Sequence, residues 1–264
     1  MLNYTDSRLT LTVDPTAAAV TSLCLDGVER LVAPSPLFCV QLRDADGNAI
    51  VLHAKDAQRC EQRTDGLRYS DFSMPAAHSV AVDVRFTAED GEMAVWVSVT
   101  PGADALAPEW VDVLPLTLPT LADNTPAGGR ILFPYNEGVL VSNIELRQSS
   151  IFPSMAPEYP SSGSYPVFPN MVGSQLLAYL WEDCGLYLAT HDATRAPKGI
   201  DFYPENGGVT LRFRMFCGCD IGESYQMPAP LTIARCNGRW ESAAERYRAW
   251  FASSLPPRDR KSVV

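Results

Sequence analysis

The chain has 264 residues, of which 46% are hydrophobic and 20% are charged. This composition is typical of a globular protein, and the length suits one large domain or two small ones. The formal net charge of −10 disfavours nucleic acid and anionic membrane surfaces as partners, because both require basic patches. The charge does not select a particular ligand, and neutral substrates such as sugars are compatible with it.

Two features bear on the cellular compartment. The first fifteen residues are polar, so we predict neither a signal peptide nor a transmembrane helix. The seven cysteines show no framework spacing, which is typical of reduced thiols and favours a cytoplasmic protein. The alternative is a secreted protein whose signal peptide has been removed.

Alternation of apolar and polar residues with a period of two dominates the first hundred residues. Residues 9–13, 38–42, 80–86 and 93–99 follow this pattern and are predicted to be β-strands. Asp-Gly pairs at residues 26–27, 65–66 and 90–91 lie between apolar runs. We therefore predict three β-hairpins at these positions.

The second half of the chain also indicates strands. Residues 175–181 and 186–191 are apolar runs on either side of a polar turn, and they predict adjacent, largely buried strands. Residues 209–215 predict a late strand with Arg212 and Arg214 on the opposite side from its apolar residues. Prolines are concentrated in residues 101–126 and 153–169, which we predict to be two long connections.

The end of the chain has a different period. Six residues fall at helical spacing and form one apolar face: Trp240, Ala243, Ala244, Tyr247, Trp250 and Phe251. We predict one helix over about residues 240–253, with Trp240, Tyr247 and Trp250 packed against the β-structure. Such a helix either caps the core or leads into another domain.

These elements predict an all-β fold. Antiparallel strands, short turns and the absence of βαβ alternation indicate a large antiparallel β-sandwich with one C-terminal helix. We divide the chain into a β-sandwich domain over residues 1–236, a capping or linking helix over 237–255, and a polar tail over 256–264.

No motif of a metal site or a catalytic centre is complete. Residues 44–48 resemble the start of a calcium loop, but the glycine comes too early and no glutamate closes the loop. Cys217 and Cys219 lack the further ligands of a zinc site. The sequence has neither a glycine-rich phosphate loop nor a nucleophile elbow. We therefore predict no metal, no cofactor and no catalytic residue.

A proline-stiffened, aromatic-rich segment over residues 152–170 is the candidate ligand-binding region. Aromatic faces with nearby amide and carboxylate groups suit sugars. The candidate substrate-binding residues are Tyr135, Asn136, Glu137, Tyr159, Tyr165, Phe168, Gln175, His191 and Asp192. The alternative is that these aromatics pack the loop onto the sandwich. For His191 and Asp192, which end a predicted strand and point to opposite faces, a structural hydrogen-bonding role is the alternative.

Four segments in this order resemble the galactose-mutarotase-like β-supersandwich domain that precedes the (β/α)8 barrel in several glycoside hydrolase families. They are residues 9–27, the Leu-Phe-Pro-Tyr-Asn-Glu-Gly run at 132–138, the Gly-Leu-Tyr-Leu-Ala-Thr-His-Asp run at 185–192, and the Trp…Tyr-Arg-Ala-Trp helix at 240–250. The resemblance implies a β-supersandwich fold and a role in carbohydrate chemistry.

The resemblance carries over no catalytic residue. In such enzymes the catalytic carboxylates lie on the barrel, which would need about 250 further residues. True mutarotases use histidines in Asn-His and His-Thr-Tyr settings, and none of His53, His78 and His191 lies in such a setting.

We therefore expect a non-catalytic domain of a carbohydrate-active enzyme. It would bind carbohydrate weakly or form a wall of a site completed by a catalytic barrel in a longer chain, and the isolated chain would not hydrolyse glycosides. One alternative is a stand-alone aldose 1-epimerase that uses His191 with Glu137, Glu158 or Asp192. Another alternative is a protein-interaction domain unrelated to sugars.

Overall fold

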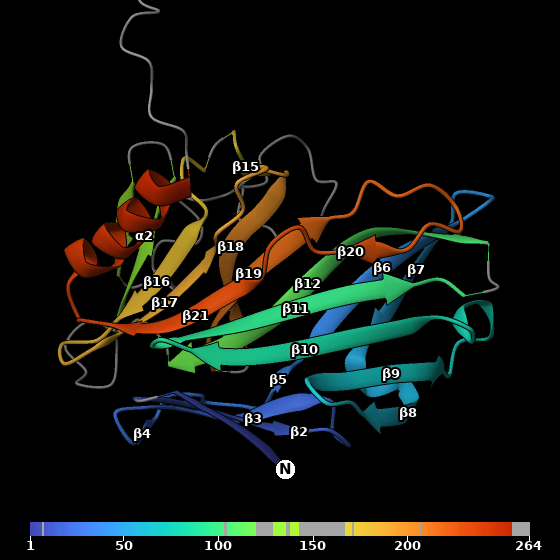
Figure 1. Cartoon of the computed structure of the whole chain (residues 1–264), viewed down its shortest axis with the longest axis horizontal. Helices are drawn as coiled ribbons and strands as arrows, with labels where there is room; N and C mark the ends of the chain where they lie inside the picture. Colours follow the sequence, from blue (N-terminus) through green and yellow to red (C-terminus); the bar gives the residue numbers. More distant parts are fainter. Residues whose placement is uncertain are drawn as a thin grey trace, which may run out of the picture.

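A computed structural model of the chain describes residues 1–6, 8–102, 105–119, 129–135, 138–142, 167–170, 172–205 and 207–254. The described residues form three sheets and one α-helix, α2 (Trp240–Ser254). All strand pairings in these sheets are antiparallel. The two larger sheets enclose the main hydrophobic core, and the smallest sheet lies along one edge of the molecule (Figure 1). The all-β sandwich with one C-terminal helix is confirmed.

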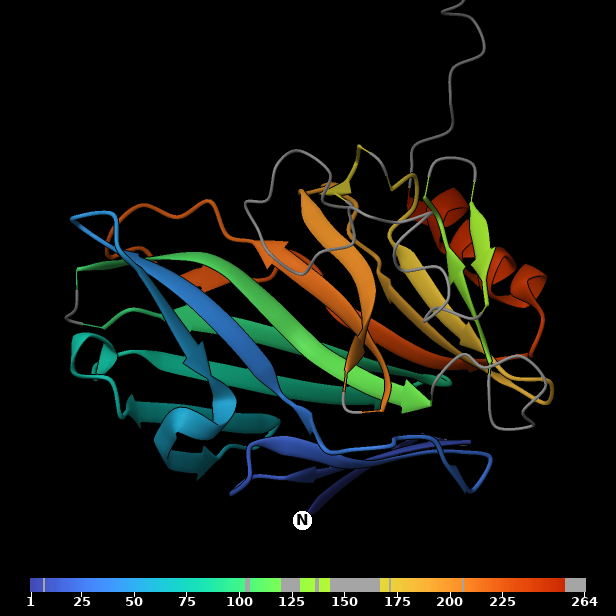
Figure 2. The same cartoon turned by 180° about the vertical axis from the view of Figure 1, so that it is seen from behind.

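The three sheets differ in size. The five-stranded sheet contains β1 (Leu2–Asp6), β2 (Leu9–Asp14), β3 (Ala19–Leu25), β4 (Val28–Glu29) and β5 (Ser35–Pro36). The ten-stranded sheet runs in the order β14 (Val139–Val141), β13 (Arg130–Phe133), β16 (Leu176–Leu180), β17 (Gly185–Thr190), β21 (Leu231–Cys236), β11 (Glu92–Thr100), β10 (Ala81–Glu89), β9 (Gly66–Phe72) and β8 (Ala57–Gln62), with β20 (Tyr225–Gln226) beside β11. The six-stranded sheet, seen from behind in Figure 2, runs in the order β15 (Val167–Phe168), β18 (Lys198–Glu205), β19 (Gly208–Phe216), β12 (Leu106–Pro119), β6 (Phe38–Asp44) and β7 (Ala49–His53). Two short 3-10 helices, η1 (Ala54–Asp56) and η2 (Pro75–Ala77), lie between strands.

The predicted hairpins are confirmed, and turn chemistry explains the longest of them. Strands β10 and β11 pair without a register shift from Ala81 opposite Thr100 to Glu89 opposite Glu92. The two residues between the strands, Asp90 and Gly91, have φ values of 53° and 81°. A two-residue turn with two positive φ values matches the twist of antiparallel strands, and Asp-Gly adopts it readily. This turn therefore fixes which residues of β10 and β11 face the core.

The first of the two predicted long connections is wrong. Residues 106–119 form β12, one of the two middle strands of the six-stranded sheet, despite their prolines. The pairing of β12 shifts register between Pro108 and Trp110 on one side and between Val113 and Leu116 on the other. Bulges of this kind accommodate prolines, because the ladder hydrogen bond is already interrupted there. The second predicted connection lies mostly outside the described residues.

Helix α2 covers one end of the ten-stranded sheet, over β16, β17 and β21 (Figure 1). These strands present small residues to the helix, namely Ala178, Ala189 and Ala234, and the fully buried Ala243 faces them from α2. Small side chains let the helix approach the sheet closely. Because β16 and β17 have the core on one face and α2 on the other, they are buried throughout. This double burial explains their continuous apolar sequences.

The predicted packing of the helix aromatics is only partly correct. Tyr247 and Trp250 are half-buried, but Trp240 is 48% exposed. Trp240 is the first residue of α2, and helical side chains tilt toward the N-terminus of their helix. A side chain at this first position has little of its own helix beside it, which accounts for the exposure of Trp240. Phe251 is also exposed, at 41%.

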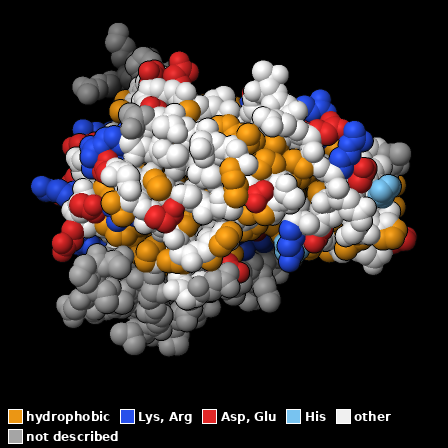
Figure 3. All heavy atoms as spheres, turned by 90° about the horizontal axis from the view of Figure 1, so that it is seen from below, with side chains coloured by type: hydrophobic (Ala, Val, Ile, Leu, Met, Phe, Trp, Pro, Cys, Tyr) orange, Lys and Arg blue, Asp and Glu red, His pale blue; other side chains and the backbone are white. Residues whose placement is uncertain are grey.

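The surface seen from below carries a mixture of charges. Figure 3 shows Lys and Arg side chains interspersed with Asp and Glu side chains, with hydrophobic side chains between them. On this face, therefore, basic side chains lie near the acidic ones although the net charge of the chain is negative.

Candidate functional site

Five of the nine candidate substrate-binding residues fall within the described residues: Tyr135, Phe168, Gln175, His191 and Asp192. The other four, Asn136, Glu137, Tyr159 and Tyr165, lie outside them, as does Glu158 of the epimerase alternative. Gln175 directly precedes β16, and His191 and Asp192 directly follow β17. Because β16 and β17 are antiparallel neighbours, all three residues lie at the same end of the sheet.

A cavity of about 250 Å³ opens at this end, between the strand ends and α2. It brings together three of the candidate residues, Phe168, Gln175 and Asp192. Tyr135 is not among its described lining residues; it forms a bridge with Val172, and its ring stacks on Phe133. The volume is just below the roughly 300–1,000 Å³ of typical ligand pockets. It therefore suits one small ring better than an extended chain.

Two of the lining residues, Gln175 and Asp192, belong to a buried polar network centred on Lys198, which is only 1% exposed and is not itself among the described lining residues. Its ammonium group donates hydrogen bonds to Gln175 Oε1 at 2.6 Å and to Asp192 Oδ2 at 2.9 Å. The side-chain amide of Gln175 in turn donates to the carbonyl oxygen of Asp192 at 3.0 Å. Asp192 Oδ1 accepts from the backbone and hydroxyl of Thr194. The network holds the turn after β17 in place.

The ionisation of this network follows from its contacts. Burial alone would raise the pKa of Asp192, but hydrogen bonds from Lys198 and Thr194 hold this pKa below its usual value. Burial lowers the pKa of Lys198, and the nearby Asp192 carboxylate opposes that shift. The carboxylate of Asp192 is therefore held in its charged form and is occupied by internal partners. This arrangement agrees with the structural alternative given above for Asp192.

His191 lies behind the cavity wall and is absent from its described lining. Its Nε2 is 2.9 Å from the hydroxyl of Tyr187, with which it is hydrogen-bonded. Its ring stacks on Trp250 of α2, with the centroids 4.9 Å apart and the planes at 11°. Burial lowers the pKa of His191 and favours the neutral ring. His191 therefore supports the tryptophan, which does line the cavity.

The remaining walls come from residues that the sequence analysis did not select as ligand-binding. Trp250 and Phe251 contribute aromatic surface from α2, and Arg195 and Arg248 contribute guanidinium groups. The hydroxyl of Tyr247 accepts a hydrogen bond from the backbone N–H of Gln175 at 3.2 Å, which fastens α2 to β16. Trp250 and Phe251 belong to the predicted apolar face of the helix, but no signal in the sequence marked them as lining a cavity.

A second cluster of charges lies on the face of the six-stranded sheet opposite the core. Arg214 of β19 donates to both carboxylate oxygens of Asp112 on β12, at 2.6 and 2.7 Å. Arg212 pairs in the same way with Asp201 of β18. The guanidinium of Arg214 also lies 3.5 Å from the ring centroid of Trp110. These four charged residues are at most 5% exposed, so their charges neutralise one another in the interior.

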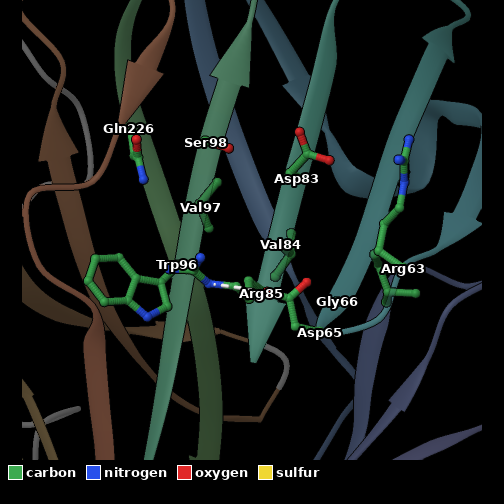
Figure 4. A pocket seen from close by; sticks show the side chains of 11 residues that line it. Arg63, Asp65, Gly66, Asp83, Val84, Arg85, Trp96, Val97, Ser98 and Gln226 are labelled. Carbon is green, nitrogen blue, oxygen red and sulfur yellow. Dashed lines mark ion pairs between the residues drawn. The ribbon is translucent and has the colours of Figure 1, made fainter. Parts of the chain in front are cut away.

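A shallower cavity of about 220 Å³ lies on the outer face of β9, β10 and β11 (Figure 4). Its main side chains are Trp96 and Arg85, which are cross-strand neighbours, with the guanidinium 5.0 Å from the indole centroid. Arg85 also forms an ion pair with Asp65, and Asp83 accepts a hydrogen bond from Arg68. Each of these charges thus has a partner of opposite sign, either within the described lining or, for Asp83, on the neighbouring Arg68.

Three further observations concern metal ions and membranes. No group of three or more His, Cys, Asp or Glu side chains that could hold a metal ion occurs in the described part of the chain. Residues 44–48, which resemble the start of a calcium loop, form a tight turn in which the Asp44 carboxylate accepts hydrogen bonds from the backbone N–H groups of Asp46 and Asn48. Within the described ranges no helix combines the length and apolar character needed to cross a membrane.

Comparisons with known proteins place the fold. No protein-family model and no curated protein sequence matches this chain significantly. Among solved structures, an α-N-acetylgalactosaminidase from Bifidobacterium bifidum superposes with a TM-score of 0.63 at 14% identity, over 96% of this chain and 39% of the enzyme. The Slr1438 protein from Synechocystis sp. PCC 6803 superposes with a TM-score of 0.52 at 10% identity, over 90% of this chain and 96% of that one.

These likenesses are at low identity and show the fold alone. The chain has the galactose-mutarotase-like β-supersandwich fold, as its sequence motifs imply. It spans about two fifths of the length of the B. bifidum enzyme, which contains a large part with no counterpart here. The activity of the whole enzyme therefore does not transfer with the fold.

Proposed function

We propose that this chain is a non-catalytic β-sandwich domain of a carbohydrate-active enzyme, and that the cavity beside α2 holds a sugar ring weakly or forms a wall of a larger site. The observation that carries the proposal is the composition of the cavity. Trp250, Phe251 and Phe168 supply flat apolar surface, and polar groups converge between them. Sugars need this combination, because their C–H faces are apolar and their hydroxyls need directional partners.

The chemistry of the lining favours binding over catalysis. Glycoside hydrolysis usually needs two carboxylates about 5–10 Å apart across the scissile bond. Among the described lining residues Asp192 is the one carboxylate, and Lys198 and Thr194 occupy its oxygens.

The epimerase alternative receives less support from this site. Epimerisation needs an acid and a base on opposite sides of one ring. His191 stacks on Trp250 and is hydrogen-bonded to Tyr187, while Asp192 accepts a hydrogen bond from Lys198. The two side chains have separate partners, so they do not form the acid–base pair considered above.

The test is a titration of the full chain with monosaccharides and oligosaccharides, followed by NMR or calorimetry. N-acetylgalactosamine belongs in the panel, because the B. bifidum relative is an α-N-acetylgalactosaminidase. We expect millimolar binding, about 4 kcal/mol, for a single open cavity. Trp250→Ala should abolish the binding, whereas the matched Trp240→Ala, on the same helix but outside the described lining, should retain it.

Two results would count against this proposal. Absence of binding to every sugar in the panel would favour the protein-interaction alternative. Binding that survives Trp250→Ala would locate the sugar elsewhere on the molecule.

A further inference from the structure

Two arginines reach the cavity beside α2 from different elements. Arg195 lies in the turn after β17, and Arg248 lies on α2; both line the cavity and both are exposed to solvent. The guanidinium of Arg195 is 5.6 Å from the ring centroid of Phe168, another lining residue. The turn that carries Arg195 is held by the bonds from Thr194 and Ala196 to Asp192. The backbone that carries Arg195 is therefore held in place.

These two guanidinium groups stand out because neither forms an ion pair with a carboxylate among the described residues. Among the described arginines, all except Arg130, Arg195 and Arg248 form an ion pair with a carboxylate. The chain has 31 acidic and 21 basic residues, so partners are in excess. Two of the three unpaired arginines nevertheless line the same cavity. The one carboxylate in the described lining, Asp192, is already paired with Lys198.

The cavity is thus locally positive on an acidic protein. Guanidinium groups form their strongest hydrogen bonds with carboxylate, sulfate or phosphate oxygens, often through two parallel N–H donors. A neutral sugar would use such donors, but it would leave both positive charges uncompensated. An anionic group on the ligand would compensate them.

We infer that the preferred ligand of this cavity is an acidic sugar, namely a pyranose ring that carries a carboxylate or a sulfate group. The aromatic surface of Trp250 and Phe251 contacts the ring, and Arg195 and Arg248 bind the anionic group. This inference rests on the proposed sugar-binding role and narrows it to one class of sugar. Carboxylate and sulfate share the chemistry that the arginines recognise, so the experiment includes both.

The test compares ligands that differ only in charge. Methyl glucuronide, a methyl glucoside 6-sulfate, neutral methyl glucoside and inorganic sulfate are each titrated into the full chain at low salt. We expect at least one acidic glycoside to bind about tenfold more tightly than the neutral one, a modest factor because the arginines are exposed. The advantage should shrink as sodium chloride rises to about 0.5 M, which screens the charges.

Variants then identify the cations responsible. Arg195→Gln and Arg248→Gln should each reduce the affinity for the acidic glycoside more than the affinity for the neutral one, so that the preference for the acidic glycoside shrinks. Arg239→Gln is the matched control, because Arg239 is an exposed arginine next to the start of α2 and outside the described lining. It should change neither affinity.

The outcomes separate the inference from the proposed function. Equal affinity for neutral and acidic glycosides, or an unchanged preference in both Arg195→Gln and Arg248→Gln, would overturn the inference and leave a neutral-sugar site. Binding of inorganic sulfate without binding of any glycoside would overturn both, because the aromatic walls would then have no role. Failure of every probe to bind would also overturn both.

Discussion

The cavity beside α2 and the charged face of the six-stranded sheet both contain arginines, and they use them in opposite ways. On the sheet, Arg212 and Arg214 are buried and each is paired with an aspartate. At the cavity, Arg195 and Arg248 are exposed and have no carboxylate partner among the described residues. A buried charge needs a partner of opposite charge inside the protein, whereas an exposed charge is solvated by water and stays available to a ligand. The first pair of arginines therefore contributes to stability, and the second pair is the one that we propose for binding.

Breaking one buried pair gives the largest expected effect. Arg214→Leu removes both hydrogen bonds to Asp112, and among the described residues it leaves that buried carboxylate with the longer 3.8 Å contact to Arg212. We expect a loss of about 3–5 kcal/mol in the free energy of unfolding, measured by urea denaturation of the full chain.

A double variant provides the control for this prediction. Replacing Asp112 as well, in Arg214→Leu/Asp112→Leu, removes the unpaired charge and should recover most of the stability. If the single variant lost less than about 1 kcal/mol, the sheet arginines would not be structural and the comparison would fail.

The two regions also differ in how far the sequence predicts them. Alternation identified β19 and placed Arg212 and Arg214 on the side opposite its apolar residues. Their partners could not be identified, because Asp112 and Asp201 lie on other strands whose positions depend on the sheet order. Strand β12 could not be predicted for a related reason. Its prolines argue against a strand, and the bulges that accommodate them become visible only once its pairing with β6 and β19 is known.

At the cavity the strand ends were predictable and the helix contribution was not. The apolar runs before and after residues 182–185 place Gln175 and Asp192 at one end of a hairpin. The position of Trp250 relative to them depends on how α2 docks on the sheet. That docking depends on three alanines on separate strands and on one hydrogen bond to Tyr247, and no local pattern in the sequence encodes it.

The aromatic wall of the cavity provides the second, smaller effect. Trp250 is half-buried and stacks on His191, so Trp250→Ala should cost about 1–2 kcal/mol, less than the roughly 3–5 kcal/mol of a fully buried tryptophan. Trp240→Ala, at a 48% exposed position on the same helix, should stay within about 0.5 kcal/mol of the wild type.

Thermal or urea unfolding of both tryptophan variants measures the difference. Equal losses would show that α2 docks differently from the arrangement described here. A Trp250→Ala loss of 3 kcal/mol or more would mean that the wall is part of the core and is not available to a ligand.

The smallest effect is a pH dependence that arises behind the cavity wall. Burial lowers the pKa of His191 from its ordinary value of 6.5, and the nearby Arg246 acts in the same direction while Glu92 opposes it. Below pH 6.5 the unfolded chain therefore takes up a proton that the folded chain does not, so stability falls as the pH decreases from about 7 toward 5. Asp192 does not interfere, because its pKa lies below its ordinary value of 3.8 and its contribution is lost only in more acidic solution.

The measurement compares the free energy of unfolding at pH 7.5 and pH 5.5 for the wild type and for His191→Gln. The variant cannot titrate at this position, so its stability should fall less between the two pH values than that of the wild type. The comparison uses the pH-dependent change and not the absolute stability, since glutamine also loses the stacking on Trp250. Identical changes would mean that His191 is protonated as easily in the folded chain as in the unfolded one. The contacts of the ring with Trp250 and Tyr187 would then not disfavour its charged form.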